Sequence, residues 1–267
     1  MIKILFYICL VFCFYSSNGL AQTKPNPDRK KPLEITADDS LEWHRNELYF
    51  KANKNVRAIQ GETKLFSDIL IAKYRDSENS GMEIYTIKAD GNVQIILSQS
   101  KAYGDKAIYN IDKGFAIMRG NNLRLVSKDQ TITARDKFRY WVNEGRLEAI
   151  GNAKAVRLGD TLEANKIIAI FKENKQGKRV LKTLEALGNV VITTPNEVLT
   201  GERAIYQATT NIAEIHENVK ITRGLNVLEG SSAQVNLATN VSKIFGGNGE
   251  KGRVRGTFYP NSKTIRK

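Results

Sequence analysis

The sequence contains very little cysteine and histidine. Its two cysteines, Cys9 and Cys13, lie within the first 21 residues, and its only histidines are His44 and His216. Beyond residue 21 there is therefore no disulfide framework, thiolate metal site or cysteine nucleophile. The histidines lack metal-ligand spacing, and we expect both on the surface. No glycine-rich phosphate loop, nucleophile elbow or paired-carboxylate motif stands out either. We therefore expect no enzyme, catalytic residue, metal site or cofactor.

Long apolar runs are missing after the N-terminus. Lys3 precedes the 12-residue apolar run Ile4–Tyr15, and the small residues Gly19 and Ala21 follow it. This arrangement predicts a secretory signal peptide at residues 1–21, cleaved after Ala21. The alternative is an uncleaved membrane anchor, but about 20 apolar residues are needed to span a bilayer. We expect a soluble, exported protein.

Acidic residues are scarce relative to basic ones. The chain has 41 Lys and Arg against 28 Asp and Glu, and removing Lys3 with the signal peptide leaves 40 − 28 = +12. Excess positive charge favours anionic partners. For an exported protein these are phosphorylated glycolipids or anionic membrane surfaces rather than nucleic acid. A solvated basic surface with no partner is the alternative.

The abundant feature is an internal repeat. "ITADDS" at Ile35–Ser40 returns as "ITARDK" at Ile132–Lys137, 97 residues later. Between and beyond them an asparagine recurs with spacings of 37, 30, 30, 37 and 29 residues, at Asn55, Asn92, Asn122, Asn152, Asn189 and Asn218. Repeats of this length indicate small units that stack on their neighbours. The sequence therefore predicts six β units in two tandem triplets.

Every unit has the same alternation after its asparagine. The first and third residues after it are apolar in all six units: Val56, Ala58, Val93, Ile95, Leu123, Leu125, Ala153, Ala155, Val190, Ile192, Val219 and Ile221. The residue between them is polar in five of the six. Such alternation is typical of a β-strand with one buried face, and helical periodicity is nowhere sustained.

Small residues recur in the strand that follows. Twelve residues after each asparagine stand Ser67, Gly104, Ala134, Ala164, Gly201 and Gly230. Small residues at a fixed strand position indicate close backbone approach, a bend or a bulge. The asparagines themselves are interpreted as turn residues before each strand, since asparagine tolerates positive φ. The expected fold is all-β and antiparallel.

The repeats resemble the OstA-like/LptA family of periplasmic lipopolysaccharide-transport proteins. The "ITADD" start, the repeated "A-x-GN-V-x-I" strands and the "L-x-G-x-x-A-x-Y" strands carry this resemblance over about Leu33–Gly246. It implies a slightly open β-jellyroll, like a short solenoid, whose apolar groove carries lipopolysaccharide acyl chains. It also implies protomers that join edge to edge in a bridge between the inner and outer membranes.

Physical reasoning alone leaves the inner face open to two interpretations. The twelve alternating apolar residues could form closed core, or they could line a lipid-binding groove if the sheets are splayed. Under the resemblance they are the candidate groove-lining residues, and lipopolysaccharide, through its lipid A part, is the expected ligand.

Sheet edges are the second candidate site. We expect a first strand at Leu33–Trp43, with Ile35, Ala37 and Leu41, and a last strand at Val254–Tyr259, with Val254 and Phe258. Unpaired edge strands can add to the sheet of another protein. The resemblance implies inner-membrane-anchored and outer-membrane lipopolysaccharide-transport proteins as partners, and head-to-tail self-association.

The predicted organisation is a signal peptide (1–21), a polar proline-rich lead (22–32), two continuous OstA-like modules (33–131 and 132–246) and a C-terminal edge strand with a basic tail (247–267). Two other functions stay open. One is a structural or adhesive envelope protein that carries no lipid. The other is a polysaccharide-active β-helix enzyme, although such an enzyme would need clustered acids and stacked aromatics.

Overall fold

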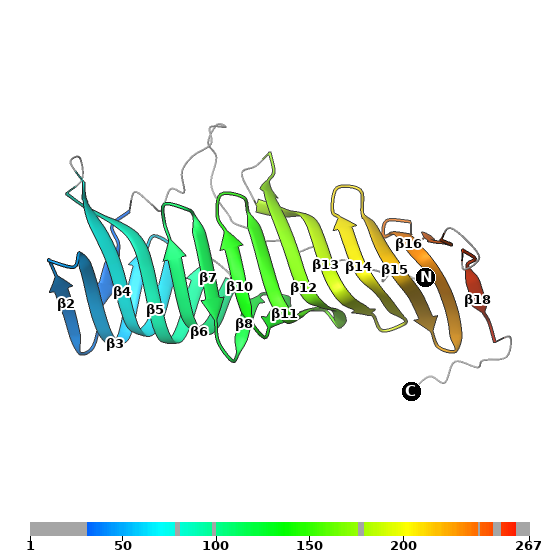
Figure 1. The fold of residues 1–267 in the computed structure, drawn as a ribbon, viewed down its shortest axis with the longest axis horizontal. Helices are drawn as coiled ribbons and strands as arrows, with labels where there is room; N and C mark the ends of the chain where they lie inside the picture. Colours follow the sequence, from blue (N-terminus) through cyan, green and yellow to red (C-terminus); the bar gives the residue numbers. More distant parts are fainter. Residues whose placement is uncertain are drawn as a thin grey trace.

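The chain forms an elongated β structure in which the strands follow one another along the long axis (Figure 1). The computed structural model describes residues 31–77, 81–97, 100–175, 179–239, 241–247 and 252–259. The predicted signal peptide, most of the proline-rich lead and the end of the basic tail lie outside the described residues.

The described residues contain strands and no helix. Strands β1 to β18 all pair in antiparallel fashion within one sheet, which confirms the all-β, antiparallel prediction. Their bounds are β1 Glu34–Thr36, β2 Ser40–His44, β3 Tyr49–Gln60, β4 Thr63–Ser77, β5 Gly81–Leu97, β6 Ser100–Asn110, β7 Phe115–Arg119, β8 Leu123–Ser127, β9 Gln130–Ala134, β10 Lys137–Trp141, β11 Arg146–Arg157, β12 Asp160–Glu173, β13 Arg179–Thr193, β14 Val198–Gln207, β15 Ile212–Arg223, β16 Asn226–Asn236, β17 Val241–Phe245 and β18 Arg255–Thr257.

Each long strand is divided by an irregularity in its pairing. In β3 the register with β4 shifts between Asn53 and Val56, and β5 shifts against β6 between Asp90 and Val93. Equivalent shifts recur in the pairings of β11 to β16. A β-bulge bends its strand and increases the local twist. The successive shifts therefore form one continuous line, the fold line, along which the sheet bends.

The fold line separates two walls. The first wall contains β2, β7, β10, β17 and the halves of the long strands that pair with them, such as residues 49–53 and 106–110. The second wall contains β1, β8, β9, β18 and the opposite halves, such as residues 56–60 and 100–104. Both walls contribute to the apolar interior, which consists of one large cluster and a smaller one at β3 and β4. The jellyroll prediction is confirmed, and the six predicted units are the six hairpins of the second wall.

At four places in the sheet, two short strands, one on each wall, take the place of one long strand. Strands β1 and β2 both pair with β3, one on each wall, and β17 and β18 flank β16 in the same way. In the middle of the chain β7 pairs with β10, and β8 pairs with β9. The two halves of the sheet are therefore joined through short strands. The expectation of one continuous strand at Leu33–Trp43 was wrong for the same reason, because this segment crosses the fold line without forming a continuous strand.

The repeated asparagines lie at the fold line, not at chain reversals. Five of them have positive φ, from 42° at Asn152 to 54° at Asn218. They stand inside long strands at the register shifts. Only Asn122 occupies a turn, and it is absent from the positive-φ residues. The interpretation as turns before each strand is thus corrected for five of six units, since the left-handed conformation serves a bulge there.

Aspartate side chains form hydrogen bonds with the repeated asparagines or with a residue beside them. Asp68 accepts a hydrogen bond from Asn92 Nδ2 at 2.8 Å, and Asp38 accepts one from Asn55 Nδ2 at 2.7 Å. Asp105 accepts from the backbone N–H of Asn121 at 2.8 Å. These contacts hold the side chains of Asn55 and Asn92 in place and satisfy one backbone N–H beside Asn122.

Candidate functional site: an apolar groove and two sheet edges

The twelve residues that the alternation singled out all lie on the inner face of the second wall. The first residue after each asparagine is almost completely buried, with exposures of 0 to 2% at Val56, Val93, Leu123, Ala153, Val190 and Val219. Of the third residues, Ala58, Ala155, Ile192 and Ile221 are buried, and Ile95 and Leu125 are partly buried. Their inward position is established, and their contact with lipid stays a prediction.

The recurring small residues lie opposite the deepest of these side chains. Val93 pairs with Gly104, Leu123 with Ala134, and Val190 with Gly201. A Cβ on Gly104 would lie 2.7 Å from Met118 Cγ and 3.0 Å from the carbonyl oxygen of Arg119. Because Met118 belongs to the first wall, the small residues allow the two walls to approach closely beside the fold line.

Farther from the fold line the walls enclose a partly open cavity of about 150 Å³. It lies where the two halves of the chain meet, and its lining is almost wholly apolar. The second wall contributes Leu65, Ile95, Leu97, Ser100, Ala102 and Leu125, and the first wall contributes Ile87, Ala107, Ile108, Tyr109, Ala116, Ile117, Met118, Phe138, Tyr140, Leu147, Phe171 and Arg179. The inner face is therefore neither wholly closed nor wholly open. Beside the fold line it forms closed core. Toward the rims, which are the edges of the walls farthest from the fold line, it leaves hollow space.

A second, smaller cavity of about 30 Å³ lies farther along the axis, between strands β12 and β15. Ile192 lines it, together with Leu162, Leu184 and Tyr206 among others. Three of the twelve candidates, Ile95, Leu125 and Ile192, thus border hollow space in the described part of the chain.

The large cavity has one polar pair, which sequence reasoning missed. Arg179 begins β13 and Tyr140 lies in β10, on the inner side of the first wall near its rim. Arg179 Nη1–H donates to the Tyr140 hydroxyl at 2.6 Å, and its Nη2–H donates to the carbonyl oxygen of Val142 at 2.9 Å. Burial raises the pKa of the Tyr140 hydroxyl above its ordinary value. The tyrosine therefore remains neutral at physiological pH.

The outer face of the first wall carries one buried carboxylate. Glu148 is 1% exposed and lies among three basic side chains. Lys166 Nζ is 3.1 Å from its Oε1, Arg139 Nη1 is 3.8 Å from its Oε2, and Arg146 also forms an ion pair with it. A buried carboxylate requires such compensation. The cluster is structural, and it concentrates positive charge on the outer surface.

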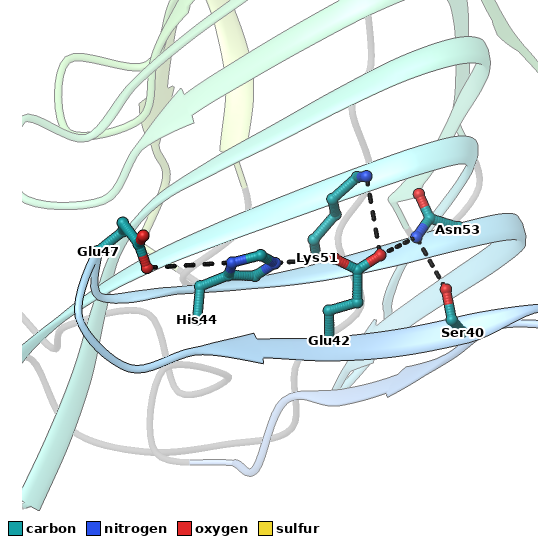
Figure 2. Close-up of polar contacts among 6 residues, drawn as sticks. All are labelled: Ser40, Glu42, His44, Glu47, Lys51 and Asn53. Carbon is teal, nitrogen blue, oxygen red and sulfur yellow. Dashed lines mark hydrogen bonds and ion pairs between the residues drawn. The ribbon is translucent and has the colours of Figure 1, made fainter.

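The N-terminal edge of the sheet has a polar outer face and an aromatic inner one. Glu42 accepts hydrogen bonds from His44 Nε2 at 2.7 Å and from Asn53 Nδ2 at 2.8 Å, and Lys51 Nζ lies 3.8 Å from it (Figure 2). Figure 2 also shows Ser40, whose hydroxyl accepts a second hydrogen bond from Asn53. The hydrogen bond from His44 is the largest of the effects that lower the pKa of Glu42.

On the other face of the same strand, Trp43 is 47% exposed and donates to the Tyr74 hydroxyl at 2.8 Å. Strand β2 is paired only through β3, so its second edge has no pairing partner in the described chain. Leu41, one of the predicted edge residues, is 56% exposed, whereas Ile35 and Ala37 are partly buried. An exposed edge with large apolar side chains is suited to strand addition.

At the other end β17 and β18 pair only with β16 in the described chain. The predicted last strand, Val254–Tyr259, is shorter than expected, because only Arg255–Thr257 pair. Val254 and Phe258 flank β18 and are 45% and 67% exposed. This end also presents unpaired backbone.

His44 and His216 are about one third or more exposed, with side-chain exposures of 32% and 39%. Across the described ranges, no group of three or more histidine, cysteine or acidic residues is placed to hold a metal ion. No helix capable of crossing a bilayer occurs in the part of the chain that the structure covers.

Two segments of the chain match the family model described as "LptA/(LptD N-terminal domain) LPS transport protein", at residues 34–146 and 131–241. The chain belongs to this family of LPS transport proteins. Its two matches are tandem repeats of one family module, as the duplicated sequence predicted, and together they cover most of the length. The family is one of transport proteins, not of enzymes.

Among solved structures, the chain is similar to LptH from Pseudomonas aeruginosa, described as "the LptA homologous periplasmic component of the conserved lipopolysaccharide transport device". The identity is 12%, the TM-score is 0.22, and the match covers 87% of this chain and 99% of LptH. No curated protein matches. The family assignment therefore rests on the two matches to the LptA/LptD module.

Proposed function

We propose that this LPS transport protein is a periplasmic carrier that shelters the acyl chains of lipid A between its two walls. The observation that carries the proposal is the partly open cavity, because an almost wholly apolar hollow of about 150 Å³ bordered by Ile95, Leu125 and Phe138 is suited to hydrocarbon. Burial of each CH₂ group contributes about 0.8 kcal/mol. Several methylenes therefore suffice for firm binding without directional contacts.

The repeated lining also suits movement of the lipid. Equivalent positions such as Ile95 and Ile192, one full duplication apart, both border hollow space. A chain moving along such a face exchanges one apolar contact for another, so successive positions differ little in free energy. Transport along the axis requires this property, and storage does not.

Bridging between the membranes is the second part of the proposal. Among the residues that the structure describes, β2 at one end of the stack and β17 and β18 at the other each pair on one side only. Strand addition there would join the chain to inner-membrane-anchored and outer-membrane LPS transport proteins, or to a second copy. The signal peptide predicted at residues 1–21 supports a location in the periplasm, and no catalytic role is proposed.

Site-specific photo-crosslinking in living cells tests the carrier function. A photoreactive side chain at Ile95 and at Ile192 should form a lipopolysaccharide adduct, and the same side chain at Arg57, which is exposed in β3, should not. Equal labelling at all three positions, or none in a folded protein, would contradict the groove and favour a structural envelope protein. Photoreactive side chains at Leu41 and Phe258 test the edges, which should crosslink to other proteins.

A further inference from the structure

Arg179 combines an apolar setting with an unused capacity to donate hydrogen bonds. Its side chain borders the large cavity and is partly buried. Two of its five N–H donors are occupied, by Tyr140 and by the carbonyl oxygen of Val142. Its cross-strand neighbour Glu173 is exposed, and within the described ranges no carboxylate forms an ion pair with Arg179. The charge of this guanidinium is therefore available to a ligand.

Tyr140 adds a second donor at the same place. Its oxygen accepts the hydrogen bond from Arg179, and its own O–H has no acceptor among the described residues, so it can donate to a ligand. Because burial raises the pKa of this hydroxyl, it keeps its proton at neutral pH. Arg179 and Tyr140 are therefore two neighbouring side chains that can both donate hydrogen bonds to one ligand, and together they form the fork.

The position of this fork determines what kind of ligand it suits. The fork lies near the rim of the first wall, whereas Ile95, Leu125 and Met118 line the apolar part of the cavity. A ligand that fills the cavity must therefore be apolar at one end and must offer acceptor oxygens at the other. Guanidinium groups bind phosphate oxygens in a two-pronged arrangement, more strongly where water is partly excluded.

We propose that Arg179 and Tyr140 bind the phosphate head group of a lipid whose acyl chain occupies the large cavity. The inference rests on the proposed carrier function and adds a site that selects phosphorylated lipids over neutral ones. It also gives the transport path one position where the lipid is held by charge, in an otherwise apolar lining.

The test compares two lipids that share one acyl chain. Myristoyl lysophosphatidic acid carries a phosphate monoester, and monomyristoylglycerol carries none. Each is titrated against the chain from residue 22 onward, loaded with a fluorescent apolar dye, and the displacement gives its Kd. The variants are Arg179→Gln and Tyr140→Phe, with Arg57→Gln as the matched control for loss of one exposed positive charge. Circular dichroism melting verifies that each variant is folded.

We expect Arg179→Gln to weaken binding of the phosphorylated lipid about tenfold, and Tyr140→Phe about threefold. Binding of the neutral lipid, and both affinities of Arg57→Gln, should stay unchanged. Equal effects of Arg179→Gln on the two lipids, or no effect on either, would overturn the phosphate site while leaving the carrier intact. If the unmodified protein binds neither lipid, the carrier function fails, and the head-group site fails with it.

Discussion

Val190 and Gly201 face each other across β13 and β14, on the inner face of the second wall. The valine is 1% exposed, and a Cβ on the glycine would lie 2.6 Å from Ile215 Cγ2 and 3.2 Å from the carbonyl oxygen of His216. A large residue fits here only because its partner is small. The same arrangement joins Val93 to Gly104 and Val219 to Gly230, so the approach of the walls depends on pairs of this kind.

Substitution of Gly201 by valine should therefore destabilise the protein by about 1–3 kcal/mol, since the added methyl groups overpack the core beside the fold line. Urea denaturation followed by circular dichroism measures the loss. Ala134→Gly is the comparison variant, since it removes a methyl group at the equivalent position of another unit and therefore cannot overpack the core. A Gly201→Val protein as stable as the unmodified one would mean that the walls can move apart.

The asparagines at the fold line provide a matched pair for testing the bulge. Asn152 has a φ of 42°, whereas Asn122, at the equivalent position of another unit, is not among the positive-φ residues. Asn152→Ala should cost about 1 kcal/mol, because alanine adopts the left-handed conformation less readily, and Asn152→Gly should largely restore the stability. Asn122→Ala should cost less than about 0.5 kcal/mol. Similar losses at both positions would show that the bulge conformation is not the cause.

Glu148 should contribute to stability through its buried charge. Replacing it by glutamine leaves Lys166, Arg139 and Arg146 without their shared counter-charge, and we expect a loss of about 2 kcal/mol in the free energy of unfolding. Glu163→Gln removes an exposed ion pair with Lys154 and should cost less than about 1 kcal/mol. Denaturation at pH 7 compares the two variants. The interpretation fails if both lose the same small amount.

Glu42 predicts a pH dependence at the N-terminal edge. Hydrogen bonds from His44 and Asn53 and the charge of Lys51 hold the pKa of this carboxyl below its ordinary value of 4.5. Its contribution to stability is therefore present above pH 4.5 and is lost as the pH falls through the lower pKa of the folded state. Thermal melting between pH 6 and pH 3 should show a slightly steeper fall of Tm for the unmodified protein than for Glu42→Gln. Parallel curves would indicate that the contacts in Figure 2 do not contribute.

The repeat allowed the inner face to be predicted from sequence. Alternation in "GNVQI" and its equivalents fixes which side chains share a face, and all twelve candidates lie on the inner one. The fold line was predicted only in part. The recurring small residues indicated a bend or a bulge, but the asparagines were interpreted as turn residues, because positive φ at asparagine is compatible with a turn and with a bulge alike. Only the pairing of Asp90 and Val93 with β6, on opposite sides of Asn92, distinguishes the two.

Arg179 could not be identified from sequence either. It follows the polar sequence "KENKQGK" at Lys172–Lys178, which is typical of a loop, and its partner Tyr140 lies 39 residues earlier. The two come together because β10, β11, β12 and β13 pair in succession. The sequence did contain a weak signal. Arg179 and Tyr140 continue the alternating positions that are otherwise apolar in their strands, so both could be expected on the inner face.

The fold line also governs where the chain can change in length. Each long strand serves both walls, so a residue inserted at a rim turn, such as between Gln60 and Thr63, would only enlarge that tip. One residue inserted at the fold line would reverse the facing of every later side chain in that strand, exposing the apolar set and burying the charged one. Insertions and deletions should therefore be accepted at the rims and rejected along the line of asparagines.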